Sequence, residues 1–338
     1  MKAVVWDGPS EGVSLKVVPV PKAAPGEIVI EVKASGLCRS DLAIIKGQLP
    51  VTKWPLVLGH QTAGIVSGVG DNVGAFRLGD RVVATPDITC SHCNYCLIGR
   101  SNLCRNLTRL GFERDGSHAE FVVTAENSVI RLPDNVSFEQ GAVSVDAVAS
   151  MYHALIGLAQ VKPGDKVVLL GIGGMGIQAI DIAHIAGASV LVTSRNSKRL
   201  DFAKQLGADI LVNTTTDDLT KEVMNFTSGE GADVVVNSIG ARDTMKQALE
   251  FIRPGGKILA IGMIDPEFVM PQYQMVMREV EIIASRLATK LDMIKVLNLI
   301  AGGKLHPAVT ASYPLTEFQK GFEALERGEI MGRGVLIP

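Results

Sequence analysis

The sequence predicts two domains of different class: a β-rich domain and an α/β domain with a doubly wound parallel sheet. The chain has 338 residues, more than one ordinary hydrophobic core accommodates. The first 147 residues contain short apolar runs separated by many glycines, which is typical of a barrel or sandwich with long loops. From residue 166 onward strand and helix patterns alternate, which indicates a parallel sheet covered by helices. The change of pattern lies near residue 148.

The spacing of apolar residues predicts the individual elements. In the β-rich part, residues 27–33 alternate apolar and polar side chains, as a half-buried strand does. The α/β part predicts strands at residues 167–170, 190–192, 210–212, 234–236 and 257–261. Helices are predicted between them, at about residues 175–186, 198–206, 218–227 and 244–251. The last fifty residues predict two amphipathic helices and a final strand, at about residues 291–301, 317–327 and 334–337.

The composition is that of a soluble globular protein, with 47% hydrophobic and 20% charged residues. A formal net charge of −2 gives no electrostatic signature for nucleic acid or an anionic membrane. Asp7 and Gly8 interrupt the apolar start of the chain, so no signal peptide is expected. No run approaches the ~18 uninterrupted apolar residues of a membrane span. Five cysteines, four of them crowded together, favour metal-bound thiolates in a reducing compartment, and we expect a cytoplasmic protein.

Four cysteines have the spacing C-x2-C-x2-C-x7-C; they are Cys90, Cys93, Cys96 and Cys104. Four thiolates about 2.3 Å from the ion, arranged as a tetrahedron, form a closed structural zinc site. His92 lies among them but is not needed as a ligand, since four thiolates complete the tetrahedron. The segment has little apolar material of its own, so metal binding is expected to supply its folding energy.

The fifth cysteine, Cys38, and the later histidine His60 are candidates for a second metal site that keeps an open, catalytic position. Each also has an ordinary explanation. A buried cysteine behaves as a small hydrophobe, and a lone histidine is often a core residue. The residues alone leave both interpretations open.

The loop Gly171-Ile172-Gly173-Gly174-Met175-Gly176 follows a predicted strand and opens a predicted helix. This is the context of a dinucleotide-binding loop, in which the first glycine permits a tight turn and the second lets the backbone approach a pyrophosphate. The third glycine packs helix against strand, and the helix N-terminus faces the phosphates. A glycine-rich turn without a ligand is the alternative.

The end of the second strand of this part indicates which nicotinamide cofactor is bound. Asp or Glu is typical at this position of an NAD site, because a carboxylate accepts a hydrogen bond from the ribose 2′-hydroxyl. Here the strand ends at Ser194 and Arg195, with Lys198 and Arg199 close behind and no acid. An arginine can bind a 2′-phosphate with two hydrogen bonds, so the sequence predicts NADP(H) in preference to NAD(H). The alternative is a solvated, basic start of a helix.

Over essentially its whole length the chain resembles the medium-chain, zinc-dependent alcohol dehydrogenases. The resemblance is carried by the four-cysteine segment, the glycine-rich loop, and the motifs Gly36-Leu37-Cys38-Arg39-Ser40-Asp41, Gly59-His60-Gln61-Thr62-Ala63-Gly64, Gly79-Asp80-Arg81-Val82 and Asp115-Gly116-Ser117-His118-Ala119-Glu120-Phe121. It implies a GroES-like catalytic domain at residues 1–147 and 288–338, with a structural zinc lobe at about residues 88–106. The Rossmann dinucleotide-binding domain is expected at residues 148–287.

The resemblance also implies roles for residues of the catalytic site. Cys38, His60 and Asp146 correspond to the ligands of the catalytic zinc, and Ser40 to the hydroxyl that relays the substrate proton. Asp146 could instead be a helix N-cap. Asp41 corresponds to the carboxylate that orients the metal-bound histidine.

Two positions depart from the family pattern. Gln61 replaces a glutamate near the metal, which removes one negative charge, and Ala43 replaces a histidine that continues the proton relay in many members. Arg39 and Arg333 correspond to family arginines near the cofactor phosphates, although either could be a surface charge.

The activity that the resemblance implies is zinc-dependent hydride transfer between NADP(H) and an alcohol, ketone or aldehyde, with two zinc ions per subunit. A polyol or sugar dehydrogenase is the alternative on the same scaffold. A non-catalytic NADPH-binding redox sensor or structural protein is the alternative of another class. Family members pair through the segment at residues 269–283, which implies a homodimer or homotetramer. Neither nucleic acid nor a membrane is expected as a partner.

Overall fold

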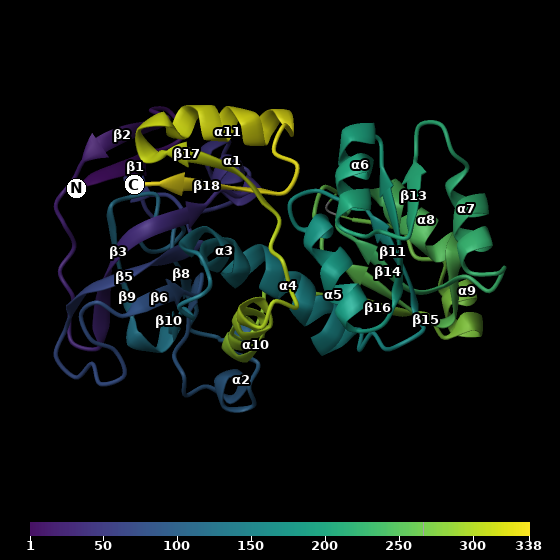
Figure 1. Cartoon of the computed structure of the whole chain (residues 1–338), viewed down its shortest axis with the longest axis horizontal. Helices are drawn as coiled ribbons and strands as arrows, with labels where there is room; N and C mark the ends of the chain where they lie inside the picture. The colour runs from purple at the N-terminus through teal and green to yellow at the C-terminus, as the bar shows by residue number, and fades with distance from the viewer. Residues whose placement is uncertain (266) are drawn as a thin grey trace. The chain divides into compact units, whose positions relative to one another are not determined.

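The chain folds into two compact units in the computed structural model, which describes residues 1–265 and 267–338 (Figure 1). Unit 1 consists of Met1–Ala149, Ala288–Gly303 and Pro307–Pro338. Unit 2 consists of Ser150–Leu287 and Lys304–His306. Each unit has sheets and a hydrophobic core of its own.

Unit 1 is β-rich, and its largest sheet has the strand order β10-β6-β5-β3-β18-β17, with β9 also paired to β3. Two smaller sheets, β2-β1-β4 and β7-β8, complete it. The strands of the large sheet are β3 (Glu27–Gly36), β5 (Thr62–Val69), β6 (Arg81–Ala84), β9 (Phe121–Ala125), β10 (Val129–Arg131), β17 (Val309–Pro314) and β18 (Arg333–Ile337). Those of the small sheets are β1 (Lys2–Trp6), β2 (Val13–Val17), β4 (Leu56–Val57), β7 (Asp87–Ile88) and β8 (Thr108–Arg109).

Short helices of unit 1 are attached to these sheets: α1 (Arg39–Ile45), α2 (Asn94–Leu97), α3 (Phe138–Val143), α10 (Lys290–Ala301) and α11 (Phe318–Arg327). One core cluster combines Leu37, Leu58 and Leu336 with Phe318 and Phe322 of α11. Leu37 immediately precedes Cys38, and Leu58 lies two positions before His60. The core therefore anchors the backbone beside both residues.

A continuous helical run from Phe138 to Leu158 includes α3, α4 (Ala149–Tyr152) and two π-helical turns, Ser144–Val148 and His153–Leu158. By length and composition this helix could cross a membrane, but 78% of its most apolar window is buried inside the structure. Burial of this extent is typical of a core helix of a globular protein. The sequence patterns did not identify this helix. Its π-helical turn carries Asp146, and such turns often occur at functional sites.

Unit 2 contains a parallel sheet with the strand order β13-β12-β11-β14-β15-β16. Its strands are β11 (Lys166–Leu170), β12 (Ser189–Ser194), β13 (Ile210–Asn213), β14 (Ala232–Asn237), β15 (Ile252–Ala260) and β16 (Glu281–Ala284). The helices packed along it are α5 (Ala179–Ile185), α6 (Ser197–Gln205), α7 (Leu219–Phe226), α8 (Arg242–Phe251) and α9 (Gln272–Arg278). This is the doubly wound order of a dinucleotide-binding fold, so the predicted α/β class is confirmed.

Two features of unit 2 differ from the sequence patterns. Strand β15 begins at Ile252, five residues before the predicted start, and its first half contains Pro254 and two glycines. Proline and glycine are unfavourable inside a strand, so the sequence pattern did not predict this half. The pairing of β15 with β14 shifts register between Ala232 and Val234. Helix α9 and strand β16 were not predicted, because Met and Val follow no clear period there.

Candidate metal and cofactor sites

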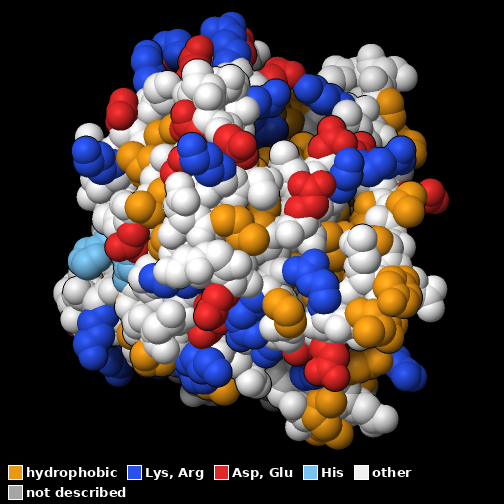
Figure 2. All heavy atoms as spheres, turned by 90° about the vertical axis from the view of Figure 1, so that its right-hand side faces the viewer, with side chains coloured by type: hydrophobic (Ala, Val, Ile, Leu, Met, Phe, Trp, Pro, Cys, Tyr) orange, Lys and Arg blue, Asp and Glu red, His pale blue; other side chains and the backbone are white. Residues whose placement is uncertain are grey.

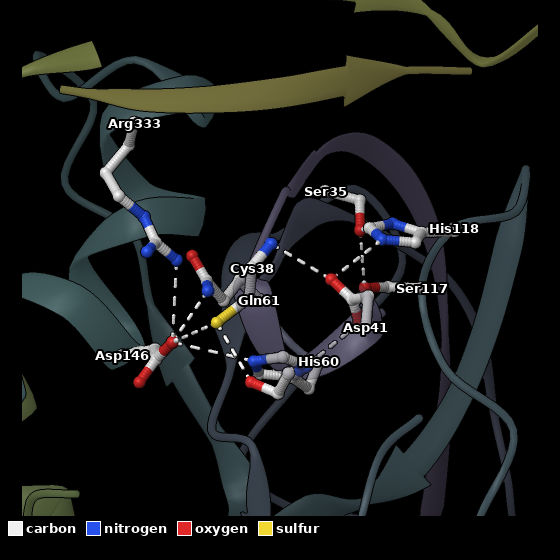
Figure 3. Close-up of polar contacts among 10 residues, drawn as sticks. Ser35, Cys38, Asp41, His60, Gln61, Ser117, His118, Asp146 and Arg333 are labelled. Atoms are coloured by element: carbon white, nitrogen blue, oxygen red, sulfur yellow. Dashed lines mark hydrogen bonds and ion pairs between the residues drawn. The ribbon is translucent and has the colours of Figure 1, made fainter. Parts of the chain in front are cut away.

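Three buried side chains of unit 1 converge, and their donor atoms lie within 4.8 Å of one another: Cys38, His60 and Asp146 (Figure 3). The Asp146 Oδ2 atom lies 3.8 Å from Cys38 Sγ and 3.5 Å from His60 Nε2. Ligands at ordinary zinc bond lengths in a tetrahedron are roughly 3.4–3.8 Å apart. The sulfur, nitrogen and oxygen donors are therefore spaced as they would be around one such ion.

Local structure places each of the three. Cys38 is the N-cap residue of α1, directly after β3, and its backbone N–H donates to Asp41 Oδ2 over 2.9 Å. His60 follows Gly59, which has a φ of +94° that only glycine adopts easily. Asp146 lies inside the π-helical turn, while Ser137 is the N-cap of that helical run. Asp146 is therefore not an N-cap residue.

Gln61 and Arg333 also contact Asp146, at the same oxygen that faces Cys38 and His60 (Figure 3). The Gln61 amide Nε2 donates to Asp146 Oδ2 over 2.6 Å, and Arg333 Nη2 lies 3.6 Å from the same oxygen. Arg333 is the first residue of β18 and is buried, so the interpretation as a surface charge is wrong. Among the described residues, Gln61 Oε1 and the Nε and Nη2 atoms of Arg333 have no hydrogen-bond partner.

The electrostatics of the cluster favour ionised acids. Burial raises the pKa of the Asp146 carboxyl, but His60 and Arg333 more than offset this and hold that pKa below its usual value. Burial likewise raises the pKa of the Cys38 thiol, and Arg333, with His60, brings it below the usual value. Burial lowers the pKa of His60, whereas hydrogen bonds to Asp146 and Asp41 raise it well above normal. A metal at this site must therefore displace a proton from His60, which favours metal binding at higher pH.

The charges in the cluster favour a metal in place of the His60 proton. The anions Cys38, Asp41 and Asp146 lie around Arg333 and around His60, whose pKa is raised. Once a metal displaces the His60 proton, the three anions and Arg333 sum to two negative charges, and unpaired buried charge is costly. A dication matches that charge, and the sulfur, nitrogen and oxygen donors fit Zn²⁺.

The four cysteines form a second, separate cluster in the lobe around α2. Their Sγ atoms are 3.6 Å apart for Cys93 and Cys96, 3.9 Å for Cys93 and Cys104, and 3.5 Å for Cys90 and Cys104. These separations match a tetrahedron of thiolates around zinc, for which roughly 3.8 Å is expected. His92 is exposed, and its ring Nδ1 lies 2.6 Å from the Cys90 carbonyl oxygen, outside the thiol cluster.

The other residues expected at the catalytic site lie on α1. Ser40 Oγ is 3.0 Å from Cys38 Sγ, so this hydroxyl lies beside the donor cluster. Asp41 is fully buried, with Oδ1 3.5 Å from His60 Nδ1. Burial raises the pKa of Asp41, but His118 and His60 outweigh it and hold the pKa far below its usual range. Arg39 is exposed on the first turn of α1.

In unit 2 the glycine-rich loop has the geometry of a phosphate-binding turn. Gly171 directly follows β11 with a φ of +85°, and a Cβ on Gly176 would lie 2.2 Å from the Gly171 carbonyl oxygen. A Cβ on Gly173 would meet nothing within 4 Å, so the middle of the loop is open. Gly174 and Met175 complete the turn before the 3₁₀ segment Gly176–Gln178 and α5. These are the conditions for a pyrophosphate to approach the backbone.

The basic residues predicted to select the cofactor gather at the end of β12 and the start of α6. Ser194 is the last residue of β12, and its Oγ accepts a hydrogen bond from the Asn196 N–H. Arg195 and Lys198 are exposed, whereas Arg199 is partly buried and its Nη1 donates to the Ile172 carbonyl in the glycine-rich loop. No acidic side chain stands at the end of β12 in this part of the described chain.

Sequence reasoning missed three buried residues that extend the site. His118 Nε2 lies 3.4 Å from Asp41 Oδ2, and Ser35 and Ser117 lie beside the His118 ring. Ser117 and His118 belong to a recognised motif and Ser35 does not, and no spacing in the sequence pairs residue 118 with residue 41. The polar contacts of Gln61 and Arg333 with Asp146 were likewise invisible in the sequence, because they join segments far apart in the chain.

Comparison with known proteins accounts for both units. Residues 24–134 match the family described as alcohol dehydrogenase GroES-like domain, and residues 171–302 match zinc-binding dehydrogenase. An alcohol dehydrogenase of Geobacillus stearothermophilus is 35% identical over 338 residues, 99% of each chain. A D-arabitol-phosphate dehydrogenase of Enterococcus avium is 34% identical, over 91% of this chain and 89% of that protein. A solved NAD-dependent alcohol dehydrogenase has a TM-score of 0.93 at 34% identity and covers 100% of both chains.

The chain therefore belongs to the medium-chain, zinc-dependent alcohol dehydrogenase family. The predicted combination of a GroES-like domain and a Rossmann domain is confirmed. Membership identifies an oxidoreductase of the alcohol and polyol dehydrogenases that works with zinc and a nicotinamide cofactor.

The two donor clusters predict two zinc ions per chain, and the cysteine lobe can be tested separately. Cys93→Ser should leave one zinc ion and lower the melting temperature by roughly 5–10 °C, because the lobe loses the metal that folds it. Zinc analysis and thermal melting of the purified protein measure both. His92→Ala, one residue away, should keep two zinc ions. A comparable loss of zinc from the His92 variant would show that the histidine is a ligand.

Proposed function

We propose that this chain is an NADP(H)-dependent oxidoreductase that transfers hydride between an alcohol and the corresponding ketone or aldehyde. The observation that carries the proposal is the buried convergence of Cys38, His60 and Asp146, whose donor atoms lie within 4.8 Å of one another. Zinc bound by these three residues would supply the Lewis acidity that makes a substrate hydroxyl more acidic or polarises a carbonyl. A second zinc, bound by the four cysteines, would be structural.

The chain's own residues provide the remaining requirements of the reaction. Ser40 presents a hydroxyl beside Cys38 and is the candidate to accept the substrate proton on alcohol oxidation and return it on carbonyl reduction. The next relay residue of many family members is Ala43 here, so this position supplies no imidazole to pass the proton on. Arg333 and Gln61 both contact Asp146 Oδ2, the oxygen that faces Cys38 and His60, and thereby restrict its position.

The cofactor would bind to the glycine-rich loop, with its pyrophosphate over Gly171, Gly173, Gly174, Met175 and Gly176. Arg39 and Arg333, which the family resemblance implies as phosphate contacts, differ in exposure: Arg39 is exposed, and Arg333 is buried beside Asp146. We propose NADP(H) in preference to NAD(H), because Arg195 and Lys198 offer positive charge where an NAD site carries an acid. A solved relative at 34% identity is NAD-dependent by its title, so the choice depends on these residues and not on the fold.

A polyol phosphate or polyol is the second candidate substrate, because a relative at 34% identity is a D-arabitol-phosphate dehydrogenase. The two classes can be separated by measuring NADPH oxidation with ketones, aldehydes and ketose phosphates, and the reverse reaction with the matching alcohols. NADH is run beside NADPH, and zinc-depleted protein beside reloaded protein. Bound NADPH without turnover of any substrate would favour a non-catalytic NADPH-binding protein and contradict the proposal.

We also propose that the chain forms a homodimer or homotetramer through unit 2. Strand β16 pairs with β15 only and lies at the edge of its sheet among the described strands. Exposed apolar side chains lie in the preceding segment: Met263, Ile264, Phe268, Val269, Met270, Tyr273, Val276 and Met277. Figure 2 shows apolar side chains gathered toward one side of the face that it presents. An open strand edge beside apolar surface is suited to pairing with a second copy.

Two further assignments remain proposals. We assign the catalytic domain to residues 1–147 and 288–338 and the cofactor domain to residues 148–287. We also place the protein in the cytoplasm, because five free thiols, four of them clustered as metal ligands would be, suit a reducing compartment.

Removing the Ser40 hydroxyl should reduce turnover without removing the metal. We expect Ser40→Ala to lower kcat by about 10²–10⁴, since general acid–base groups contribute factors of this size. Ser40→Thr keeps a hydroxyl and should retain most of the activity. Steady-state kinetics and zinc content are measured for both variants. A kcat for Ser40→Ala within a few-fold of the wild-type value would exclude the relay role.

Removing the Arg195 guanidinium should weaken the binding of NADPH and not that of NADH. A charge-assisted pair with a 2′-phosphate contributes about 1.5–3 kcal/mol. Arg195→Ala should therefore raise the KM for NADPH roughly 10- to 100-fold and leave the KM for NADH nearly unchanged. Lys204→Ala, on the exposed last turn of α6, the helix that follows Arg195, is the matched control and should change neither KM. If the wild-type protein uses NADH as well as NADPH, the assignment of NADP(H) is wrong.

A charge on the apolar face of α9 should disrupt the oligomer. We expect Val276→Glu to convert the assembly to smaller species in light scattering, because a buried unpaired carboxylate is costly at an interface. Val17→Glu introduces the same charge at an exposed valine of β2 in unit 1 and should leave the assembly intact. A monomeric wild-type protein, or an intact Val276→Glu oligomer, would contradict pairing through this face.

A further inference from the structure

The carboxylate beside the candidate metal-binding histidine is held by a second histidine on its other side. We propose that His118 is a positioning residue that acts through Asp41 to fix the ring of His60 with Nε2 turned toward Cys38 and Asp146. This inference rests on the proposed function, because it requires His60 to bind zinc. His118 does not touch the donor cluster itself. Its effect would be exerted through Asp41, which lies between the two rings (Figure 3).

The contacts form a continuous buried chain. His60 Nδ1 lies 3.5 Å from Asp41 Oδ1, and His118 Nε2 lies 3.4 Å from Asp41 Oδ2. On the far side of the ring, His118 Nδ1 is 2.7 Å from Ser35 Oγ, which is 2.8 Å from Ser117 Oγ. Ser35, Asp41, Ser117 and His118 are 0% exposed, and His60 is 4% exposed. Water cannot replace any of these partners without a structural change.

One arrangement of protons fits these contacts and leaves His60 Nε2 available to a metal. In it, the nitrogen that faces Asp41 carries a proton in both histidines, because a carboxylate accepts hydrogen bonds. The Nδ1 atom of His118 then accepts from the Ser35 hydroxyl, and Ser35 accepts from Ser117. The unprotonated Nε2 of His60 lies on the side of Asp146. This is the tautomer that a metal requires, and partners of this kind are known to set it.

The backbone holds His118 against the segment that carries His60. The His118 N–H donates to the Leu58 carbonyl over 2.8 Å, and the Ser117 N–H donates to the Gly59 carbonyl over 2.9 Å. A Cβ on Gly59 would lie 2.6 Å from His118 Nδ1, so the ring packs directly on the backbone before His60. The position of His60 and that of His118 are therefore fixed relative to each other.

A purely packing role is the competing explanation, because the His118 ring also contacts Phe322, with ring centroids 5.8 Å apart. A histidine that only filled space would not need both nitrogens opposite polar partners. Phenylalanine would fill similar space and would leave Asp41 and Ser35 each without one partner. Unpaired buried groups are costly, so the two roles predict different effects of that substitution.

The experiment measures Zn²⁺ affinity at the Cys38 site by chelator competition in the full-length protein, for His118→Phe, His118→Gln and Phe322→Leu. Cobalt substitution gives a spectroscopic readout of the ligand set. We expect His118→Phe to lower the zinc affinity of the Cys38 site roughly 10- to 100-fold, as loss of a partner that orients a metal ligand does. Zinc in the four-cysteine lobe should be retained. His118→Gln restores a donor toward Asp41 and should recover most of the affinity. Phe322→Leu alters the packing alone and should leave the affinity unchanged.

The outcomes separate this inference from the proposed function. Affinity of His118→Phe within about twofold of wild type, or an equal loss in Phe322→Leu, would overturn the positioning role alone. A wild-type chain that holds zinc only in the four-cysteine lobe would overturn both proposals. If His118→Phe fails to fold, Ser35→Ala is measured in its place. Loss of one hydrogen bond to His118 should lower the zinc affinity of the Cys38 site about 2- to 10-fold, and an unchanged affinity would refute the inference.

Discussion

A buried excess of negative charge is the constraint on which the catalytic half of this protein depends. The carboxylates Asp41 and Asp146 and the Cys38 thiolate are enclosed with Arg333 and with His60, whose pKa is raised, and both carboxyl pKa values lie below normal. Such a cluster is costly to bury, because desolvation penalises each anion and the anions repel one another. A bound dication would offset that cost, and the sulfur, nitrogen and oxygen donors favour zinc over calcium or magnesium.

The fold of unit 1 brings this cluster together from four segments that are distant in the sequence. Cys38 comes from the end of a central strand, His60 from the turn after Gly59, Asp146 from a π-helical turn and Arg333 from the C-terminal strand. Three of these segments are anchored by one core, through Leu37, Leu58 and Leu336. Rigid attachment matters because a metal site tolerates only small displacements of its ligands. The hydrophobic core thus contributes to the chemistry by holding the metal-binding side chains in position.

The sequence predicted those features that depend on the spacing of residues close together in the chain. The four cysteines, the glycines of the loop after β11 and the strand–helix alternation were predictable because each depends on residues close together in the chain. Contacts between distant segments were not predictable in that way. Cys38, His60 and Asp146 were grouped by resemblance to a family, and the burial of Arg333 and the contact of His118 with Asp41 had no signal in the spacing. Strand β15 was misjudged at its start because its partners override the effect of Pro254.

The glutamine at position 61 limits the negative charge that the cluster buries. A glutamate there would add a further buried carboxylate beside Asp146, and buried charge is costly. The amide instead donates to Asp146 Oδ2, so the same oxygen that faces Cys38 and His60 is held by a neutral group. On the opposite side, His118 Nε2 lies 3.4 Å from Asp41 Oδ2. In the arrangement proposed above, Gln61 and His118 therefore orient Asp146 and Asp41 without adding negative charge that a metal must match.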